Sequence, residues 1–371
     1  MSLTKEQAVH CANVFSNYFD RFQRIDDYIR DQKLNSLSDR PIVLPGMGPE
    51  EDLFSDFTIH PNDMDFELVE LPQDNWDIYL NMISSHSNMT SIPGRCLRLA
   101  VLEKNTKKWV GFIRLGSPVI NMKTRNEMLG GVFTQTPESA KSFNQTSIMG
   151  FVIVPSQPFG FNYLGGKLLA AICCSHWVRE KLNAKYDMNT CLFETTSLYG
   201  SSKSSSQYDG MKPYLRFKGL TDSDFLPMMH GKPYEDLKNY VENILGEIVP
   251  ADASSRKLKI SNKIISLTKQ ALKGEPEYQK FMTTITNALN LTEKKRYYAS
   301  NYGFSNFADV VMGKTDKLIP DKENYDKHHL DAIIDWWKRK ATTRFESLQA
   351  ENRIRTEIEV WTSGKELDII R

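Results

Sequence analysis

Four polar side chains near a predicted strand have the chemistry that a group-transfer reaction needs. A carboxylate at a strand end can act as a general base toward an amine, and a tyrosine hydroxyl can donate to a leaving group or stack on a base. A serine beside them can hold a substrate by a hydrogen bond. The candidate catalytic residues, at and after the strand predicted over 191–196, are Glu194, Ser197, Tyr199 and Tyr208. Each also fits an ordinary structural role, because glutamates cap turns and tyrosines pack in cores.

A loop with several glycines precedes these residues. It follows a strand predicted over 147–154 and leads into an apolar helix predicted over 164–182. Glycines at a helix start let backbone N–H groups point at an anion, and the helix N-terminus adds positive potential. The residues predicted to hold a pyrophosphate-bearing donor are Val154, Gly160, Asn162, Gly165, Gly166 and Lys167. The alternative is that Gly165 and Gly166 only allow the helix to pack closely on the strand.

Basic residues gather in the last third of the chain. From Arg256 to Arg296 there are ten Lys or Arg and three Glu, and aromatic residues lie among or beside them. Such a mixture suits phosphate contacts combined with base stacking. The candidate nucleic-acid-binding residues are Lys294, Lys295, Arg296, Tyr297, Lys338, Arg339 and Lys340. Solvated helix faces with buried aromatics explain the same pattern equally well.

The elements that position these residues can be predicted from hydrophobic periodicity. Apolar residues at three- and four-residue spacing indicate helices, and short apolar runs bounded by turn residues indicate strands. Thr4 and Gln7 predict a capping box at the start of the first helix. The predicted strands are 96–102, 109–115, 147–154 and 191–196, and the predicted helices are 1–35, 164–182, 233–247, 256–291 and 327–357.

The order of these elements predicts a mixed α/β (α+β) fold in three parts. The strand–helix–strand unit after residue 147 is typical of α/β layers. The predicted parts are an N-terminal helical region over 1–45, an α/β core over 46–235 and a mostly helical, basic C-terminal domain over 236–371. Ten acidic residues and no Lys or Arg lie between Glu50 and Asp77, which favours a solvated acidic face.

Composition restricts the class of protein. The chain has 371 residues, 40% of them hydrophobic and 25% charged, which is ordinary for a globular protein. A formal net charge of +1 argues neither for nor against a nucleic-acid partner. The five cysteines form no CxxC or zinc-type spacing, so we predict no metal site and a reducing compartment. Without a signal-like N-terminus or a long apolar run, we predict a cytoplasmic protein with no membrane partner.

Two segments resemble the GNAT acyltransferases. The predicted hairpin KKWVGFIRLGSPV resembles the hairpin of that family, which carries the phrase "vGfi". The loop before Leu168 and Leu169 resembles the GNAT loop that cradles the pyrophosphate of acyl-CoA. Gly165 takes the place of that motif's second glycine, whereas Tyr163 stands at the first glycine and Gly160 at the Gln or Arg.

A narrower resemblance lies in the segments FETTSLYG and SQYDGMKPYLRFKGLT, over 193–200 and 206–221. They resemble DruA-like proteins of bacterial anti-phage systems, mobile elements and phages. They are also similar to the phage Mom protein, a GNAT-like enzyme that adds a carbamoylmethyl group to DNA adenine. The resemblance implies a GNAT-like core with a mixed sheet, acyl-CoA or a similar donor, DNA as the partner, and the host cytoplasm if the chain is phage-encoded.

Three functions remain open from the sequence. The first is transfer of a small acyl-type group to an amine on DNA. The second is DNA binding, or a defence or counter-defence role, by a protein that keeps the fold without the chemistry. The third is a virion or assembly component. The sequence does not indicate the oligomeric state.

Overall fold

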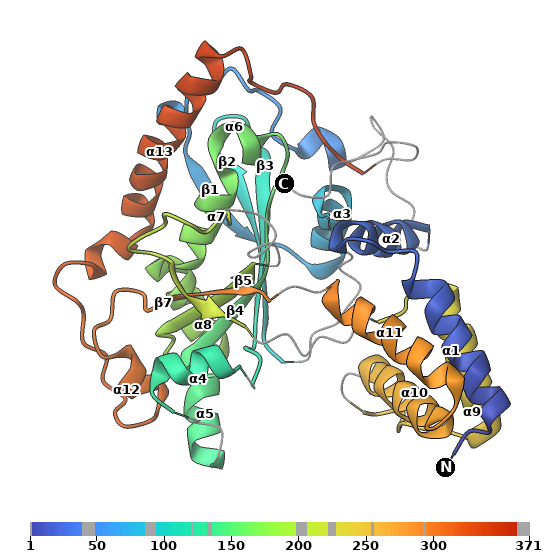
Figure 1. Cartoon of the computed structure of the whole chain (residues 1–371). Coiled ribbons are helices and arrows are strands. Elements are labelled where there is room, and N and C mark those ends of the chain that lie inside the picture. The colour runs from blue at the N-terminus through green and yellow to red at the C-terminus, as the bar shows by residue number, and fades with distance from the viewer. Residues whose placement is uncertain are drawn as a thin grey trace.

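The fold is a central sheet with helices on both faces and a bundle of helices beside it (Figure 1). It is seen in a computed structural model. The residues that the structure describes are 2–38, 49–85, 94–120, 122–131, 136–197, 206–221, 228–253, 256–291 and 294–361.

Seven strands form one mixed sheet. The strands are β1 (Phe66–Glu70), β2 (Cys96–Glu103), β3 (Lys108–Gly116), β4 (Ser147–Pro155), β5 (Leu192–Ser197), β6 (Arg216–Leu220) and β7 (Arg296–Ser300). Their order is β1-β2-β3-β4-β5-β7-β6, and only β4 and β5 run parallel. The four predicted strands and the α+β fold class are confirmed.

The parallel pair is short. It runs from Ser147 opposite Leu192 to Gly150 opposite Thr195. Beyond this point β4 continues to Pro155 and pairs as a strand only with β3, while β5 continues along β7. The end of β4 is therefore separate from β5, and it leads into the loop that was predicted to hold a donor.

Helices cover both faces of the sheet. Those of the sheet region are α3 (Gln73–Ile83), α4 (Lys123–Leu129), α5 (Pro137–Thr146), α6 (Phe159–Tyr163), α7 (Gly165–Cys173), α8 (His176–Tyr186), α12 (Phe307–Val311) and α13 (Leu330–Ala350), with 3-10 turns at Pro49–Asp52, Pro61–Asp63 and Tyr325–His328. Figure 1 shows α7 and α13 on one face and α3 on the other. The α7 face buries the largest apolar cluster, and Trp76 of α3 packs with Phe112 and Val152 on the opposite face.

The helix predicted over 164–182 is two helices. Cys174 ends α7, and the hydroxyl of Ser175 accepts a hydrogen bond from the Val178 amide to begin α8. A serine in this position is a strong helix start. The apolar run hides the break, because Cys173 and Cys174 are both fully buried and continue the hydrophobic pattern.

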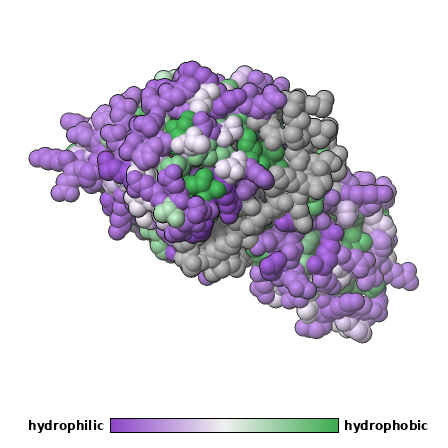
Figure 2. All heavy atoms as spheres, turned by 90° about the horizontal axis from the view of Figure 1, so that it is seen from above, coloured by the Kyte–Doolittle hydropathy of each residue, from purple (hydrophilic) through white to green (hydrophobic). Residues whose placement is uncertain are grey.

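The remaining helices form a separate bundle. They are α1 (Lys5–Phe19), α2 (Ile25–Ser38), α9 (Gly231–Leu245), α10 (Arg256–Leu272) and α11 (Pro276–Asn290). Helices α1, α9, α10 and α11 share one apolar cluster, which includes Phe15, Leu237, Ile264 and Phe281. The capping box of Thr4 and Gln7 is confirmed. Seen from above, the sheet region and the bundle both present mostly hydrophilic side chains (Figure 2).

Two predicted helices are each divided into two. The helix predicted over 1–35 stops at Phe19 and resumes at Ile25. The helix predicted over 256–291 is divided at Gly274, which has φ +88°, a left-handed conformation that glycine adopts without strain. Pro276 then begins the next helix, where its fixed φ is favourable.

The apolar cores group the helices and strands differently from the three predicted parts of the chain. The predicted domain boundaries themselves remain a prediction. Helix α1 from the first part joins α9, α10 and α11 in one core. Strand β7, from the predicted C-terminal domain, lies inside the sheet between β5 and β6. The acidic segment is folded, since Phe54, Phe57 and Phe66 are buried in the main core. Among the described residues, no helix is long and apolar enough to cross a membrane.

Two buried histidines should make the protein acid-sensitive. Burial lowers the pKa of His328 to about 4, and that of His230 likewise, with a smaller contribution from Lys257 at His230. In the unfolded chain a histidine titrates near ~6.5, so it takes up a proton first as the pH falls. The contribution of each histidine to the free energy of unfolding is therefore fully present above pH ~6.5. It is lost progressively as the pH falls toward ~4, by up to about 3 kcal/mol per histidine.

Urea unfolding between pH 7.5 and 4 checks this expectation. The test variant is His328→Asn. Its amide can still donate to the Cys174 carbonyl oxygen, as Nδ1 of His328 does at 2.7 Å. This variant should lose a large part of the pH dependence. An unchanged pH profile in the variant would show that His328 is not responsible.

Candidate functional site

A cationic pocket lies between the start of α7 and one face of α13. Its volume is about 650 Å³. The residues that line it are Leu164, Lys167, Trp336, Arg339, Lys340, Thr343, Arg344 and Ser347. The site thus combines the loop after β4 with a helix that comes about 170 residues later in the chain.

The α7 side of the pocket is shaped by a sharp turn. Leu164 lies between α6 and α7 in the left-handed conformation, with φ 56° and ψ 40°, and α7 begins directly after it. Lys167 therefore stands in the first turn of α7. Its ammonium donates to the carbonyl oxygens of Gln207 and Asp209.

The charge of Lys167 is costly where it lies. Burial lowers the pKa of its ammonium, and the nearby charge of Lys340 lowers the pKa further, whereas Asp209 raises it. An anion in the pocket would offset both unfavourable effects. The first turn of a helix also carries positive potential from its own backbone.

The α13 side is held in place by the helix's apolar face. Trp337 and Phe345 are buried against the sheet region, and Nε1 of Trp337 donates to the Tyr163 carbonyl oxygen at 2.8 Å. The next face around α13 carries side chains at three- and four-residue spacing, which places them in one row. These residues are Trp336, Arg339, Lys340, Thr343, Arg344 and Ser347.

The pocket has four cations and no carboxylate in its lining. Lys167, Arg339, Lys340 and Arg344 make no salt bridge with any carboxylate of the described residues. Arg344 instead donates to the Phe161 carbonyl oxygen and lies 4.7 Å from the centre of the Phe161 ring. Because like charges repel one another, such a pocket favours an anionic ligand.

An aromatic side chain lies among these cations. Trp336 is half-buried, with the Tyr214 ring edge-on at 4.9 Å and the Lys340 ammonium 5.5 Å from its ring centre. The indole supplies a flat apolar surface beside the charges. Positive groups next to an aromatic ring suit a ligand that carries both a phosphate and a base.

Two predicted sites therefore meet in one place. Lys167 was predicted to bind a donor, while Arg339 and Lys340 were predicted to bind nucleic acid, and all three line the same pocket. Sequence reasoning missed Arg344, and it placed Trp336 in the basic cluster over 336–340 without naming it as a binding residue. The helical spacing of these residues with Arg339 and Lys340 was the signal that could have found them.

The other basic residues predicted to bind nucleic acid lie outside this pocket. Lys338 donates to the Asn62 carbonyl oxygen at 3.1 Å. Arg296 pairs with the Asp209 carboxylate at 2.7 Å. Lys294 and Lys295 precede β7, and burial lowers the pKa of Lys295. Tyr297 is fully buried inside the sheet, so its ring is not available for stacking on a base.

The glycines of the predicted donor loop face side chains instead of an open cradle. A Cβ atom at Gly165 would lie 2.6 Å from the Phe159 ring, and one at Gly166 would lie 2.2 Å from Oε1 of Gln207. A Cβ atom at Gly160 would meet Gln157 at 2.4 Å. These contacts agree with the alternative interpretation, in which the glycines allow close packing.

The other two predicted donor-binding residues have partners within the protein. Asn162 is fully buried and donates to the Arg355 carbonyl oxygen at 2.7 Å. Its own side-chain oxygen accepts from the Arg355 amide at 3.1 Å. Val154 lies near the end of β4, opposite Phe112 of β3.

Glu194, the predicted general base, is part of a buried ion pair. Its Oε1 accepts from Nη1 of Arg125 at 2.9 Å, and its Oε2 accepts from the Tyr297 hydroxyl at 3.0 Å. Neither Glu194 nor Arg125 has any exposed side-chain surface. Burial raises the pKa of Glu194, and the Arg125 charge opposes this effect. In this arrangement the carboxylate has no path to a substrate.

Ser197 and Tyr208, two of the other predicted catalytic residues, make no hydrogen bond with Glu194 in the part of the chain that the structure describes. Tyr208 is buried and packs edge-on against Tyr298, with ring centres 5.3 Å apart. Ser197 is half-buried at the end of β5. Tyr199 lies outside the described residues.

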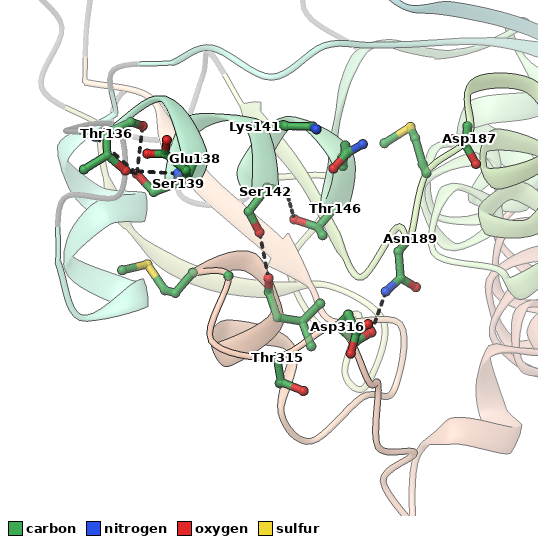
Figure 3. A pocket seen from close by; sticks show the side chains of 15 residues that line it. Thr136, Glu138, Ser139, Lys141, Ser142, Thr146, Asp187, Asn189, Thr315 and Asp316 are labelled. Carbon is green, nitrogen blue, oxygen red and sulfur yellow. Dashed lines mark hydrogen bonds between the residues drawn. The ribbon is translucent and has the colours of Figure 1, made fainter.

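A second cavity lies among α5, the turn before β5 and the segment after α12 (Figure 3). Its volume is about 740 Å³, and its charged lining residues are Glu138, Lys141, Asp187 and Asp316. Figure 3 shows hydrogen bonds that join its walls, and one of them links Nδ2 of Asn189 to the Asp316 carbonyl oxygen at 2.8 Å. Three carboxylates against one lysine disfavour a phosphate, so the two cavities have opposite charge.

No candidate metal-binding site is found in the part of the chain that the structure describes. Within it, His, Cys, Asp and Glu form no group of three or more that could hold a metal ion.

The fold and site define an α+β protein with a cationic pocket beside an aromatic ring. Residues 53–203 of the chain match the family model described as Druantia protein DruA. The match covers less than half of the 371 residues, and it includes strands β1 to β5 and Lys167 but not α13. No curated protein and no solved structure matches the chain.

Proposed function

We propose that this chain binds nucleic acid in a phage-defence or mobile-element setting, with a phosphate-bearing strand held in the cationic pocket. The observation that carries the proposal is the group of four cations around Trp336, with no carboxylate in the lining. The setting rests on the similarity of residues 53–203 to DruA.

Physical chemistry favours a single strand over a duplex in this pocket. Each lysine or arginine that neutralises a phosphate releases counterions, which drives binding and makes it depend on salt. A base can stack on an aromatic ring only when it is not enclosed in a double helix. The pocket holds cations and an indole together, as single-strand binding requires.

The double variant Arg339→Gln and Lys340→Gln tests the proposal. Both side chains are exposed and leave the apolar face of α13 intact. We expect roughly tenfold to hundredfold weaker binding of a fluorescent oligothymidylate at fixed salt, measured by anisotropy. The salt dependence should also become shallower by about 0.7 for each phosphate that the variant no longer neutralises.

Lys141→Gln is the control for the site, because it removes a cation from the acidic cavity instead of the cationic pocket. It should bind like the wild type. Equal affinity of the wild type and the Arg339/Lys340 variant would contradict the proposal.

A second candidate function is transfer of a small acyl-type group from acyl-CoA or a similar donor to an amine on DNA, on a GNAT-like or Mom-like core. The observation that favours it is the position of Leu164 and Lys167, which follow β4 and line the same pocket. A CoA-type donor carries phosphates and an adenine, so it has the chemistry that the pocket favours. For Glu194 to act as the base, its carboxylate would have to leave Arg125.

Thermal unfolding with acetyl-CoA, CoA and oligonucleotides separates the two functions. Stabilisation by CoA compounds that disappears in the Arg339/Lys340 variant, together with modified nucleosides in treated DNA, would support the transferase. Stabilisation by oligonucleotides alone would support binding without chemistry. A ligand at 100 times its Kd stabilises by about 2.7 kcal/mol, which is readily measured.

A further inference from the structure

We propose that the exposed face of α10 binds the phosphate backbone of duplex nucleic acid. It is a surface on the helical bundle, and it does not depend on the cationic pocket of the sheet region. We name it the α10 face. The residues that form it are Lys259, Asn262, Lys263, Ser266 and Gln270, together with Lys273 directly after the helix, and Lys269 lies half-buried at its edge.

The core of the bundle fixes which side of α10 faces solvent. Ile260, Ile264, Ile265 and Leu272 are all buried in the apolar cluster shared with α1, α9 and α11. In a helix with 3.6 residues per turn, the residues of the α10 face then lie together on the opposite side. Helix α10 therefore cannot rotate to hide its lysines without breaking that core.

Helix α10 carries no carboxylate of its own that could compensate the charge of the α10 face. Helix α10 contains five Lys or Arg and no Asp or Glu. Arg256 is engaged by Glu242 and Glu247 at 3.3 and 3.4 Å. Lys257 turns toward His230, at 3.2 Å, and toward the Tyr234 ring.

The lysines of the α10 face, unlike Arg256 and Lys257, remain available to bind a partner. None of Lys259, Lys263, Lys269 and Lys273 makes a salt bridge with a carboxylate among the described residues. Glu275, which follows α10, pairs with Lys5 at 2.5 Å, and Glu235 on α9 pairs with Lys238 at 2.9 Å. The bundle thus presents one basic face to solvent.

The composition of the α10 face selects duplex nucleic acid over a protein partner. Protein interfaces are enriched in aromatic residues and depleted of lysine, whereas the α10 face has lysines, small polar residues and no aromatic residue. Without a ring on which bases could stack, it also lacks what a single strand uses. From Lys259 to Lys273 the face extends for about 21 Å, which is roughly six base-pair steps along the axis of a duplex.

The triple variant Lys259→Gln, Lys263→Gln and Lys273→Gln of the full chain tests the proposal. Glutamine preserves helix propensity, and a thermal unfolding curve will verify the fold. Binding of a 20-base-pair duplex, as the probe, should weaken, and its dependence of log K on log salt should become shallower by about 3. Binding of an oligothymidylate, which is assigned to the pocket, should change less than about twofold, so failure of either site is recognised separately.

The control is Lys232→Gln and Lys280→Gln, which removes two exposed lysines from α9 and α11 of the same bundle. This control should keep the duplex affinity and salt slope of the wild type. The proposal would be overturned by an unchanged duplex slope in the α10 variant, by an equal change in the control, or by no duplex binding in the wild type.

Discussion

Replacing Arg125 by methionine should lower the free energy of unfolding by about 3–5 kcal/mol at neutral pH. The reason is that Glu194 would remain fully buried without its charged partner. The guanidinium of Arg125 also donates to the carbonyl oxygens of Val119 and Ile120, which would lose their donors. Urea unfolding at pH 7 measures the effect.

The destabilisation should shrink in acid. Without Arg125, the buried Glu194 prefers to be protonated, because burial already raises its pKa and the opposing charge is gone. In the unfolded chain a glutamate ionises near ~4.3, so the penalty exists above that pH and disappears as the pH falls toward it. The wild type should show a smaller gain, because the Arg125 charge opposes the effect of burial.

The double variant Arg125→Met and Glu194→Leu separates a broken ion pair from general damage at this site. Replacing a whole buried pair by apolar residues is often neutral, so the double variant should recover much of the missing stability. If it is as unstable as Arg125→Met alone, the uncompensated carboxylate is not the cause.

Replacing Lys33 by methionine should instead raise the free energy of unfolding, by about 2–4 kcal/mol at pH 7. Lys33 on α2 has no exposed surface, and burial lowers the pKa of its ammonium to about 7. Its Nζ donates to the Asn81 carbonyl oxygen at 2.8 Å and lies 5.7 Å from the centre of the Trp361 ring, and no carboxylate of the described residues pairs with it. Methionine keeps the packing and removes the buried charge.

The gain should depend on pH. The folded pKa lies below that of a free lysine, near ~10.4, so the folded state is penalised as the pH falls from ~10 to ~7. At pH 10 the benefit of the substitution should nearly vanish, since the wild-type side chain is then neutral in the fold. Lys317→Met, at an exposed position, should change stability by less than about 0.5 kcal/mol at either pH. A destabilised Lys33→Met variant would show that the buried lysine contributes net stability.

Local patterns predicted four of the seven strands, β2 to β5, because the signal of each lies within its own residues, whereas β1, β6 and β7 were missed. The run that became β3 ends at Gly116, and the run that became β4 ends at Pro155, so each boundary was visible in the sequence. The short strand β7 was different. Its residues, Arg296–Ser300, follow two lysines and resemble a basic surface segment, and only pairing with β5 and β6 makes them a strand.

The candidate site was predicted in pieces, because sequence reasoning does not bring distant residues together. Lys167 and Arg339 were each identified from local composition, but their meeting depends on how α13 packs along α7. The partner of Glu194 was missed for the same reason, since Arg125 lies 69 positions earlier in the chain. Burial then changes the interpretation of Glu194 from a base to one half of an ion pair.

The most direct test of the central claim is photochemical cross-linking of a 4-thiothymidine oligonucleotide to the wild-type chain, followed by mass spectrometry of the linked peptides. The account predicts cross-links to Trp336 or to its neighbours in the cationic pocket, and their disappearance in the Arg339/Lys340 variant. Cross-links that map only to other surfaces, such as the acidic cavity beside α5, would contradict it.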